Sequence, residues 1–186
     1  MRVRGPEMTQ YRIALMALLL FFPWRKECRF YPMPPRKMPS TACTANTKGD
    51  FPSVRDIFPK EARERFDQGR VIFVDTRKPS EMAVSVLPGA ITQDEFTKHP
   101  ERLFGKTVVA YCTISYRSGI FAREEAERGI EVLNLKGGIL AWILEGGQVN
   151  DAQGKPTRRV HVYGEKWDFA PSGWESVKFS FWEQML

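Results

Sequence analysis

Short apolar runs without polar alternation are the clearest hydrophobic pattern in this chain of 186 residues. Their length and their content of β-branched residues are typical of parallel strands that are covered on both faces. The runs lie at residues 71–74, 107–111 and 132–135. Helix-forming stretches are expected between or after them, at residues 59–68, 93–99, 118–128 and 139–145. This alternation predicts right-handed β-α-β crossovers and a three-layer α/β/α domain with a central parallel sheet, over residues 51–150.

A different pattern precedes this domain. Residues 13–22 form an apolar run of ten, and prolines break regular structure in the linker that follows, up to residue 50. Ten apolar residues are far fewer than the roughly 20 that span a bilayer. The run is therefore an export signal without a clear cleavage site, an interfacial membrane anchor, or sequence upstream of the true start.

A third pattern follows the domain in residues 151–186. A turn-rich stretch leads to residues 159–163, which alternate as a half-buried strand does. A dense group of aromatic residues comes next: Trp167, Phe169, Trp174, Phe179, Phe181 and Trp182. Because so many aromatic rings would expose a large apolar area, we expect this extension to pack on the domain, and the alternative is a patch that binds a partner.

The net charge of +6 belongs to the first part of the chain. Residues 1–50 contain nine Lys and Arg against three Asp and Glu, whereas residues 51–186 contain nineteen of each kind. Since the folded part has no net basic field, we expect no nucleic-acid partner.

Cys112 is the candidate for chemistry, because it lies where a strand ends and a helix begins. Backbone amides at a helix N-terminus, together with the nearby Arg117, would favour a reactive thiolate there. The alternative is an inert buried cysteine. Cys28 and Cys43 add no metal-binding spacing, so we expect a reduced Cys112 and a cytoplasmic protein; export or membrane contact through residues 13–22 is the alternative.

Other titratable residues suggest no second centre. His99 and His161 are the only histidines, and we expect both at the surface. The chain has no metal-ligand cluster and no glycine-rich phosphate loop. We therefore expect neither a metal nor a cofactor.

Four motifs in order give the chain a resemblance to the rhodanese-like sulfurtransferase domain. The loop runs from Cys112 to Arg117-Ser118 with four residues between cysteine and arginine, as in that family. Upstream lie an Asp-x-Arg-x-x-x-Glu segment and a Leu-Pro-Gly-Ala turn, and downstream lies a Gly-Gly-x-x-Ala-Trp-x-x-x-Gly segment. The chain departs from the family at three positions. Ser115 stands where glycine is common, Tyr116 where a small or polar residue is common, and Val86 where histidine is common.

The resemblance implies a thiosulfate-type sulfurtransferase that carries sulfane sulfur as a persulfide on Cys112. It makes Cys112 and Arg117 the catalytic residues, and the donor-binding loop consists of Thr113, Ile114, Ser115, Tyr116 and Ser118. Asp75 is expected to support neighbouring loops, with Arg77 paired to Glu81. The donor would be thiosulfate or a protein persulfide, and the acceptor a thiol or cyanide.

Two alternatives remain at this point. In the first, the domain is a non-catalytic sulfur-relay or protein-binding module. The bulk of Ser115 and Tyr116 favours this alternative, because it narrows access to the loop. In the second, the domain is a cysteine-dependent phosphatase, although related phosphatases have five residues between cysteine and arginine and this chain has four.

Overall fold

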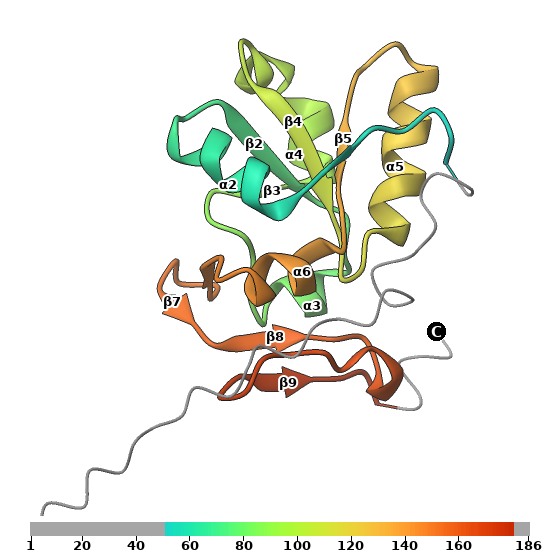
Figure 1. The fold of residues 1–186 in the computed structure, drawn as a ribbon. Helices are drawn as coiled ribbons and strands as arrows, with labels where there is room; N and C mark the ends of the chain where they lie inside the picture. Colours follow the sequence, from blue (N-terminus) through green and yellow to red (C-terminus); the bar gives the residue numbers. More distant parts are fainter. Residues whose placement is uncertain (1–50, 181–186) are drawn as a thin grey trace, which may run out of the picture. The chain divides into compact units, whose positions relative to one another are not determined.

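The computed structural model describes residues 51–180 (Figure 1). The expectations for residues 1–50, and for Phe181 and Trp182, lie outside this range. Within it, five strands form one sheet in the order β1-β5-β4-β2-β3, and all neighbouring strands are parallel. These strands are β1 (Asp56–Ile57), β2 (Val71–Asp75), β3 (Ile91–Thr92), β4 (Thr107–Tyr111) and β5 (Leu133–Leu135).

Helices cover both faces of this sheet. They are α2 (Pro59–Asp67), α3 (Pro79–Met82), α4 (Gln93–Lys98), the 3-10 turn η1 (Pro100–Leu103), α5 (Tyr116–Glu127) and α6 (Gly138–Leu144). Phe73 and Val109 lie in one core cluster with residues of α2 and α6. Ile72 and Val108 lie in a second cluster with residues of α4 and α5. Because adjacent residues of β2 and β4 enter different clusters, the sheet is covered on both sides, which confirms the predicted three-layer α/β/α arrangement.

The predicted helices agree with the structure to within two residues at each end. The sequence pattern did not predict β1 and β3, which have two residues each. A strand of that length gives too short an apolar run for a periodicity argument. Both lie at the edges of the sheet and are defined by their pairing with β5 and β2.

The C-terminal segment, defined here as residues 151–180, packs on the same core. It follows β6 (Val149–Asn150) and contains β7 (Pro156–Thr157), β8 (Arg159–His161), η2 (Glu165–Trp167) and β9 (Glu175–Val177). Strands β8 and β9 pair in parallel. The side chains of Val160 and Val162 are fully buried and belong to the core cluster of α2 and α6. In Figure 1 this segment runs past α3 and α6, near the carboxyl ends of the central strands.

No helix within residues 51–180 is both long and apolar enough to cross a membrane.

The N-terminus of α6 is pressed against the backbone that follows β4. Gly138 has a φ of +60°, and a Cβ added to it would lie 2.7 Å from the carbonyl carbon of Thr113. The amide of Ile139 donates to the carbonyl oxygen of Cys112 at 2.9 Å. The position therefore requires glycine both for its positive φ and for the close approach of two backbones.

We predict that Gly138→Ala destabilises the fold by more than its backbone conformation explains. Gly154→Ala is the matched control, because Gly154 has a φ of +76° but no atom within 4 Å of the point that a Cβ would occupy. The control should lose about 1–2 kcal/mol of unfolding free energy, and Gly138→Ala a further 1–3 kcal/mol or so from overpacking. Urea unfolding measures both, and equal losses would contradict the close approach.

Candidate active site

Cys112 lies directly after β4, at the edge of the sheet where parallel strands end. Asp75 and Tyr111, the last residues of β2 and β4, are paired in register, and the Thr76 amide and hydroxyl both donate to the Tyr111 carbonyl at 3.0 Å. Ligands of open α/β sheets bind outside this edge. Here Cys112 lines a pocket of about 430 Å³.

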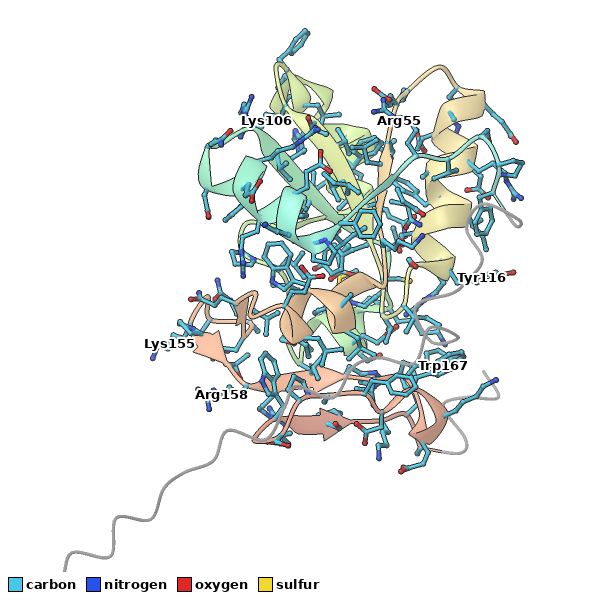
Figure 2. All side chains as sticks on the ribbon, viewed as in Figure 1. Arg55, Lys106, Tyr116, Lys155, Arg158 and Trp167 are labelled. Atoms are coloured by element: carbon cyan, nitrogen blue, oxygen red, sulfur yellow. The ribbon has the colours of Figure 1, made fainter. Side chains whose placement is uncertain are left out.

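The other lining residues come from two parts of the chain. The loop after β4 supplies one group, and the C-terminal segment supplies the other: Thr113, Ile114, Tyr116 and Arg117, and Tyr163 and Trp167. Figure 2 labels one residue from each part, Tyr116 at the start of α5 and Trp167 in η2. The structure thus brings together Cys112 and most of the predicted loop residues, and it adds two aromatic rings that the motifs did not indicate.

A left-handed residue turns the loop into α5. Ser115, at the position where the family commonly has glycine, has a φ of +74°. Its side chain is buried, and its hydroxyl oxygen accepts a hydrogen bond from the Gly137 amide at 3.2 Å. This contact helps to offset the cost of a Cβ at positive φ, so the chain makes the turn without glycine.

The backbone amides of residues 113–118 follow Cys112 directly in the chain. None of them donates to an acceptor within residues 51–180, and for residues 115–118 this is expected at the start of a helix. The helix that they begin, α5, has twelve residues. Free amides next to Cys112 would stabilise an anion, whether a thiolate, a persulfide or an incoming donor.

Arg117 does not present a free positive charge to the pocket. Its two terminal nitrogens donate to the two carboxylate oxygens of Glu81, at 2.6 and 2.8 Å. One of them also contacts the Thr113 hydroxyl at 3.2 Å. The Glu81 side chain is fully buried, so the charge of Arg117 is compensated by a carboxylate that water does not reach.

The expected pairing of Arg77 with Glu81 is therefore wrong. Arg77 instead donates through Nε and Nη2 to Asp75, with the shortest distance 2.7 Å, and from Nη2 to the Ser85 carbonyl at 2.6 Å. Asp75 lies two residues before Arg77 and accepts from its backbone amide as well. Arg77 pairs with Asp75, the acid of the motif that is nearer to it in sequence. Glu81 is therefore available to pair with Arg117 of the loop.

Asp75 also holds the end of β4. The Tyr111 hydroxyl donates to Asp75 Oδ2 at 2.5 Å and accepts from the Leu87 amide at 3.1 Å. Burial, followed by the charge of Asp75, raises the pKa of Tyr111 well above its ordinary value, so the phenol keeps its proton. Asp75 and Arg77 thus form a buried support beneath the loop, and neither lines the Cys112 pocket.

Ser118 is turned away from the pocket. Its hydroxyl donates to Asn134 Oδ1 at 2.7 Å, and Asn134 in turn donates to Asp56. The predicted role in the donor-binding loop can therefore rest only on its backbone amide.

His161 is buried, contrary to the surface position expected for it. Only 3% of this residue is exposed, its Nδ1 accepts from the Tyr163 amide at 3.1 Å, and the same atom lies 3.9 Å from Glu81 Oε1. One hint was present in the sequence, because His161 lies in the alternating stretch 159–163. Its proximity to Glu81 depends on a contact between α3 and β8, which sequence spacing does not reveal.

Within residues 51–180, no group of three or more His, Cys, Asp or Glu side chains could hold a metal ion. The groups nearest the thiol are instead amides, an ion pair and aromatic rings.

These features define a class of protein: a parallel α/β domain with a cysteine at a strand end and a loop closed by Arg-Ser. Residues 58–145 match the family model of the rhodanese-like domain. The chain therefore contains a rhodanese-like domain, which confirms the resemblance of its motifs.

Matches with particular proteins cover about half of this chain. The tRNA uridine(34) hydroxylase of Cupriavidus necator is 37% identical over 116 residues, a match that covers 54% of this chain and 40% of that protein. An uncharacterized protein of Synechocystis is 36% identical over 90 residues, covering 46% of this chain and 50% of that protein. The chain thus spans half or less of the length of these relatives. A thiosulfate sulfurtransferase from Pseudomonas aeruginosa superposes with a TM-score of 0.48 at 20% identity, over 59% of this chain and 22% of the other.

We predict that the ion pair of Glu81 makes stability depend on acid pH. Burial raises the pKa of Glu81, but its hydrogen bonds and the charge of Arg117 outweigh burial, and the pKa lies below its ordinary value. An unfolded glutamate titrates near 4.3. The unfolded chain therefore binds this proton first, so the stabilisation is complete above about pH 4.3 and is lost as the pH falls through the folded pKa.

The measurement is the free energy of unfolding between pH 3 and pH 7. Glu81→Gln should flatten the acid limb of this curve, whereas Glu124→Gln, a control on the exposed side of α5, should leave it as in the wild type. An unchanged acid limb in Glu81→Gln would refute the assignment.

Proposed function

We propose that this protein is a sulfurtransferase of the rhodanese type, in which Cys112 carries sulfane sulfur as a persulfide. The observation that supports it best is the position of Cys112 in the pocket, next to six backbone amides with no acceptor among the described residues. A thiolate needs such a setting for attack, and a persulfide anion needs it to persist. The matched rhodanese-like domain supports the same chemistry.

The reaction has two steps. The Cys112 thiolate attacks the terminal sulfur of the donor, a new S–S bond forms, and the donor's own bond to that sulfur breaks. With thiosulfate, sulfite leaves with the electron pair. A thiol or cyanide then attacks the terminal sulfur of the persulfide, and the Cys112 thiolate is restored. Neither step requires a metal or a cofactor.

The loop supplies the electrostatic part of this mechanism. The amides of residues 113–118 would hold the anionic end of the donor and stabilise the persulfide. Arg117 fixes the loop through Glu81 and Thr113, and its own charge is compensated by Glu81. We place the reaction in the cytoplasm, where Cys112 stays reduced, with a thiol as acceptor and no nucleic-acid partner.

A sulfur-relay module that accepts sulfur only from a protein persulfide is the alternative within the same chemistry. Ile114 and Tyr116 support it, because both line the pocket and their bulk would narrow access for a small donor. Turnover with a small donor distinguishes the two, since a relay would barely use one.

A second candidate is the modification of a uridine in tRNA, the activity for which several relatives are named. The aromatic rings of Tyr116, Tyr163 and Trp167 around the thiol favour it, because unstacked bases bind against such rings. The balanced charge of residues 51–186 weighs against it. Incubation with tRNA, followed by nucleoside mass spectrometry, tests it directly.

A cysteine-dependent phosphatase is a poorer match. The loop has four residues between Cys112 and Arg117, and the arginine is held by Glu81. A phosphate dianion would lack both the extra loop residue of the related phosphatases and an uncompensated cation.

We predict that intact protein gains about 32 Da after treatment with a sulfane-sulfur donor, and that Cys112→Ser abolishes this gain. The control is a Cys28→Ser, Cys43→Ser double variant, which removes the other two thiols of the chain and should keep the adduct. Mass spectrometry of the intact chain measures all three proteins. Cys112-dependent hydrolysis of an aryl phosphate without any sulfur adduct would overturn the proposal.

A further inference from the structure

The Cys112 pocket has an aromatic wall, which we define as Tyr116 of α5 and Tyr163 and Trp167 of the C-terminal segment. Two of these rings lie after residue 150, beyond the matched rhodanese-like region. The pocket volume of about 430 Å³ falls within the range of sites that hold small organic ligands, roughly 300–1,000 Å³. It has room for more than a four- or five-atom inorganic anion.

The wall is attached to the described fold on both sides of the pocket. Tyr163 follows the buried residues of β8 and contacts the ring of Phe179 edge-on, with the centroids 5.2 Å apart. Tyr116 contacts Phe51, with the centroids 5.7 Å apart. These rings are therefore held in place before a ligand arrives, which lowers the entropy cost of binding against them.

Among the described residues that line the pocket, the charge is close to balanced. Their one guanidinium, that of Arg117, forms a two-point ion pair with buried Glu81. The ring of Tyr163 also lies 5.6 Å from this guanidinium carbon. Lys166 lies near Trp167, with its ammonium 4.8 Å from the ring centroid, but its side chain is exposed, so water and salt screen it.

An inorganic dianion is poorly matched to such a site. The loop amides can compensate one negative charge, but a second charge would have to lose water next to apolar rings, with no free cation among the described lining residues. A donor with one negative charge and an apolar substituent avoids this cost and gains contact with the rings.

We infer that the preferred donor is an organic sulfane-sulfur compound that has a single negative charge and an apolar, preferably aromatic, substituent, such as an aryl thiosulfonate. This inference rests on the proposed sulfur transfer and specifies its donor. The Cys112 thiolate attacks the terminal sulfur of the thiosulfonate, the bond between that sulfur and the sulfonyl sulfur breaks, and an aryl sulfinate leaves with the electron pair. Cyanide then takes the terminal sulfur as thiocyanate and restores the thiolate.

The test compares kcat/KM for benzenethiosulfonate and thiosulfate, with cyanide as acceptor and thiocyanate as the measured product. The wild type should favour benzenethiosulfonate about tenfold or more, since its ring contacts the aromatic wall and the second charge of thiosulfate adds to the difference. Trp167→Ala should lower this ratio by about fivefold to tenfold. The control is Phe104→Ala, a change in an aromatic residue that is 85% exposed and does not line the pocket, and it should leave the ratio unchanged.

A second variant tests the charge argument without removing a ring. Glu81→Gln keeps a hydrogen-bond acceptor for Arg117 but removes the compensating charge, so it should shift the ratio toward thiosulfate. Circular dichroism and a thermal melt establish that each variant is folded before rates are compared.

The outcomes separate the donor inference from the proposed function. Equal use of both donors, a preference for thiosulfate, or an unchanged ratio in Trp167→Ala would overturn the inference and leave sulfur transfer in place. If Cys112 takes up sulfur from neither donor, the proposed function itself fails.

Discussion

The buried carboxylate of Glu81 connects three parts of this fold that are distant in sequence. It belongs to α3, it holds Arg117 of the loop by two hydrogen bonds, and it lies 3.9 Å from His161 of β8. Its own position is fixed by the Lys78 amide, which donates to Oε2 at 3.0 Å. A carboxylate that is fully buried is tolerated only with such partners, because desolvation of an unpaired charge costs several kcal/mol. The loop, α3 and the C-terminal segment therefore depend on one another at this point.

A second buried ion pair, between Asp75 and Arg77, supports the edge of the sheet from which the loop begins. Asp75 at the end of β2 binds Arg77 and Tyr111, and Tyr111 immediately precedes Cys112. The register of β2 against β4 places Asp75 opposite Tyr111. A shift in that register would move the cysteine away from the amides of α5 and from Gly138, so the geometry of the site depends on sheet pairing as much as on the loop itself.

The sequence predicted the layered architecture, three of the five central strands and the position of the loop. Apolar runs that become β2, β4 and β5 were visible because both faces of each strand are buried, and the motifs located Cys112, Arg117 and the glycine pair at 137–138. The spacing could not decide which acid pairs with which arginine. Asp75 and Glu81 both lie near Arg77 in sequence, and only the folded chain brings Arg117 to Glu81.

The C-terminal segment shows a similar limit. Its aromatic density indicated burial. Of the described members of the aromatic group, Phe179 is buried, and the others are half-buried: Trp167, Phe169 and Trp174. Nothing in the composition showed that Tyr163 and Trp167 line the pocket of a cysteine some fifty residues earlier. That contact arises because β8 packs beside α3, and a tertiary contact of this kind has no local periodicity by which sequence could predict it.

The compensated arginine is the feature that best separates the candidate functions. Phosphoryl chemistry and inorganic thiosulfate both bring two or more negative charges to the thiol, and both would need a cation that Glu81 does not already bind. An organic donor or a protein persulfide brings one charge at most, and the amides of residues 113–118, which have no acceptor in the described part of the chain, are suited to hold it. A pyrimidine base brings none and would rely on the aromatic wall alone. Since the amides and the wall lie on the same pocket as Cys112, a singly charged ligand with an apolar body is the one that would use both, and this is why the chemistry we propose is sulfur transfer from such a donor.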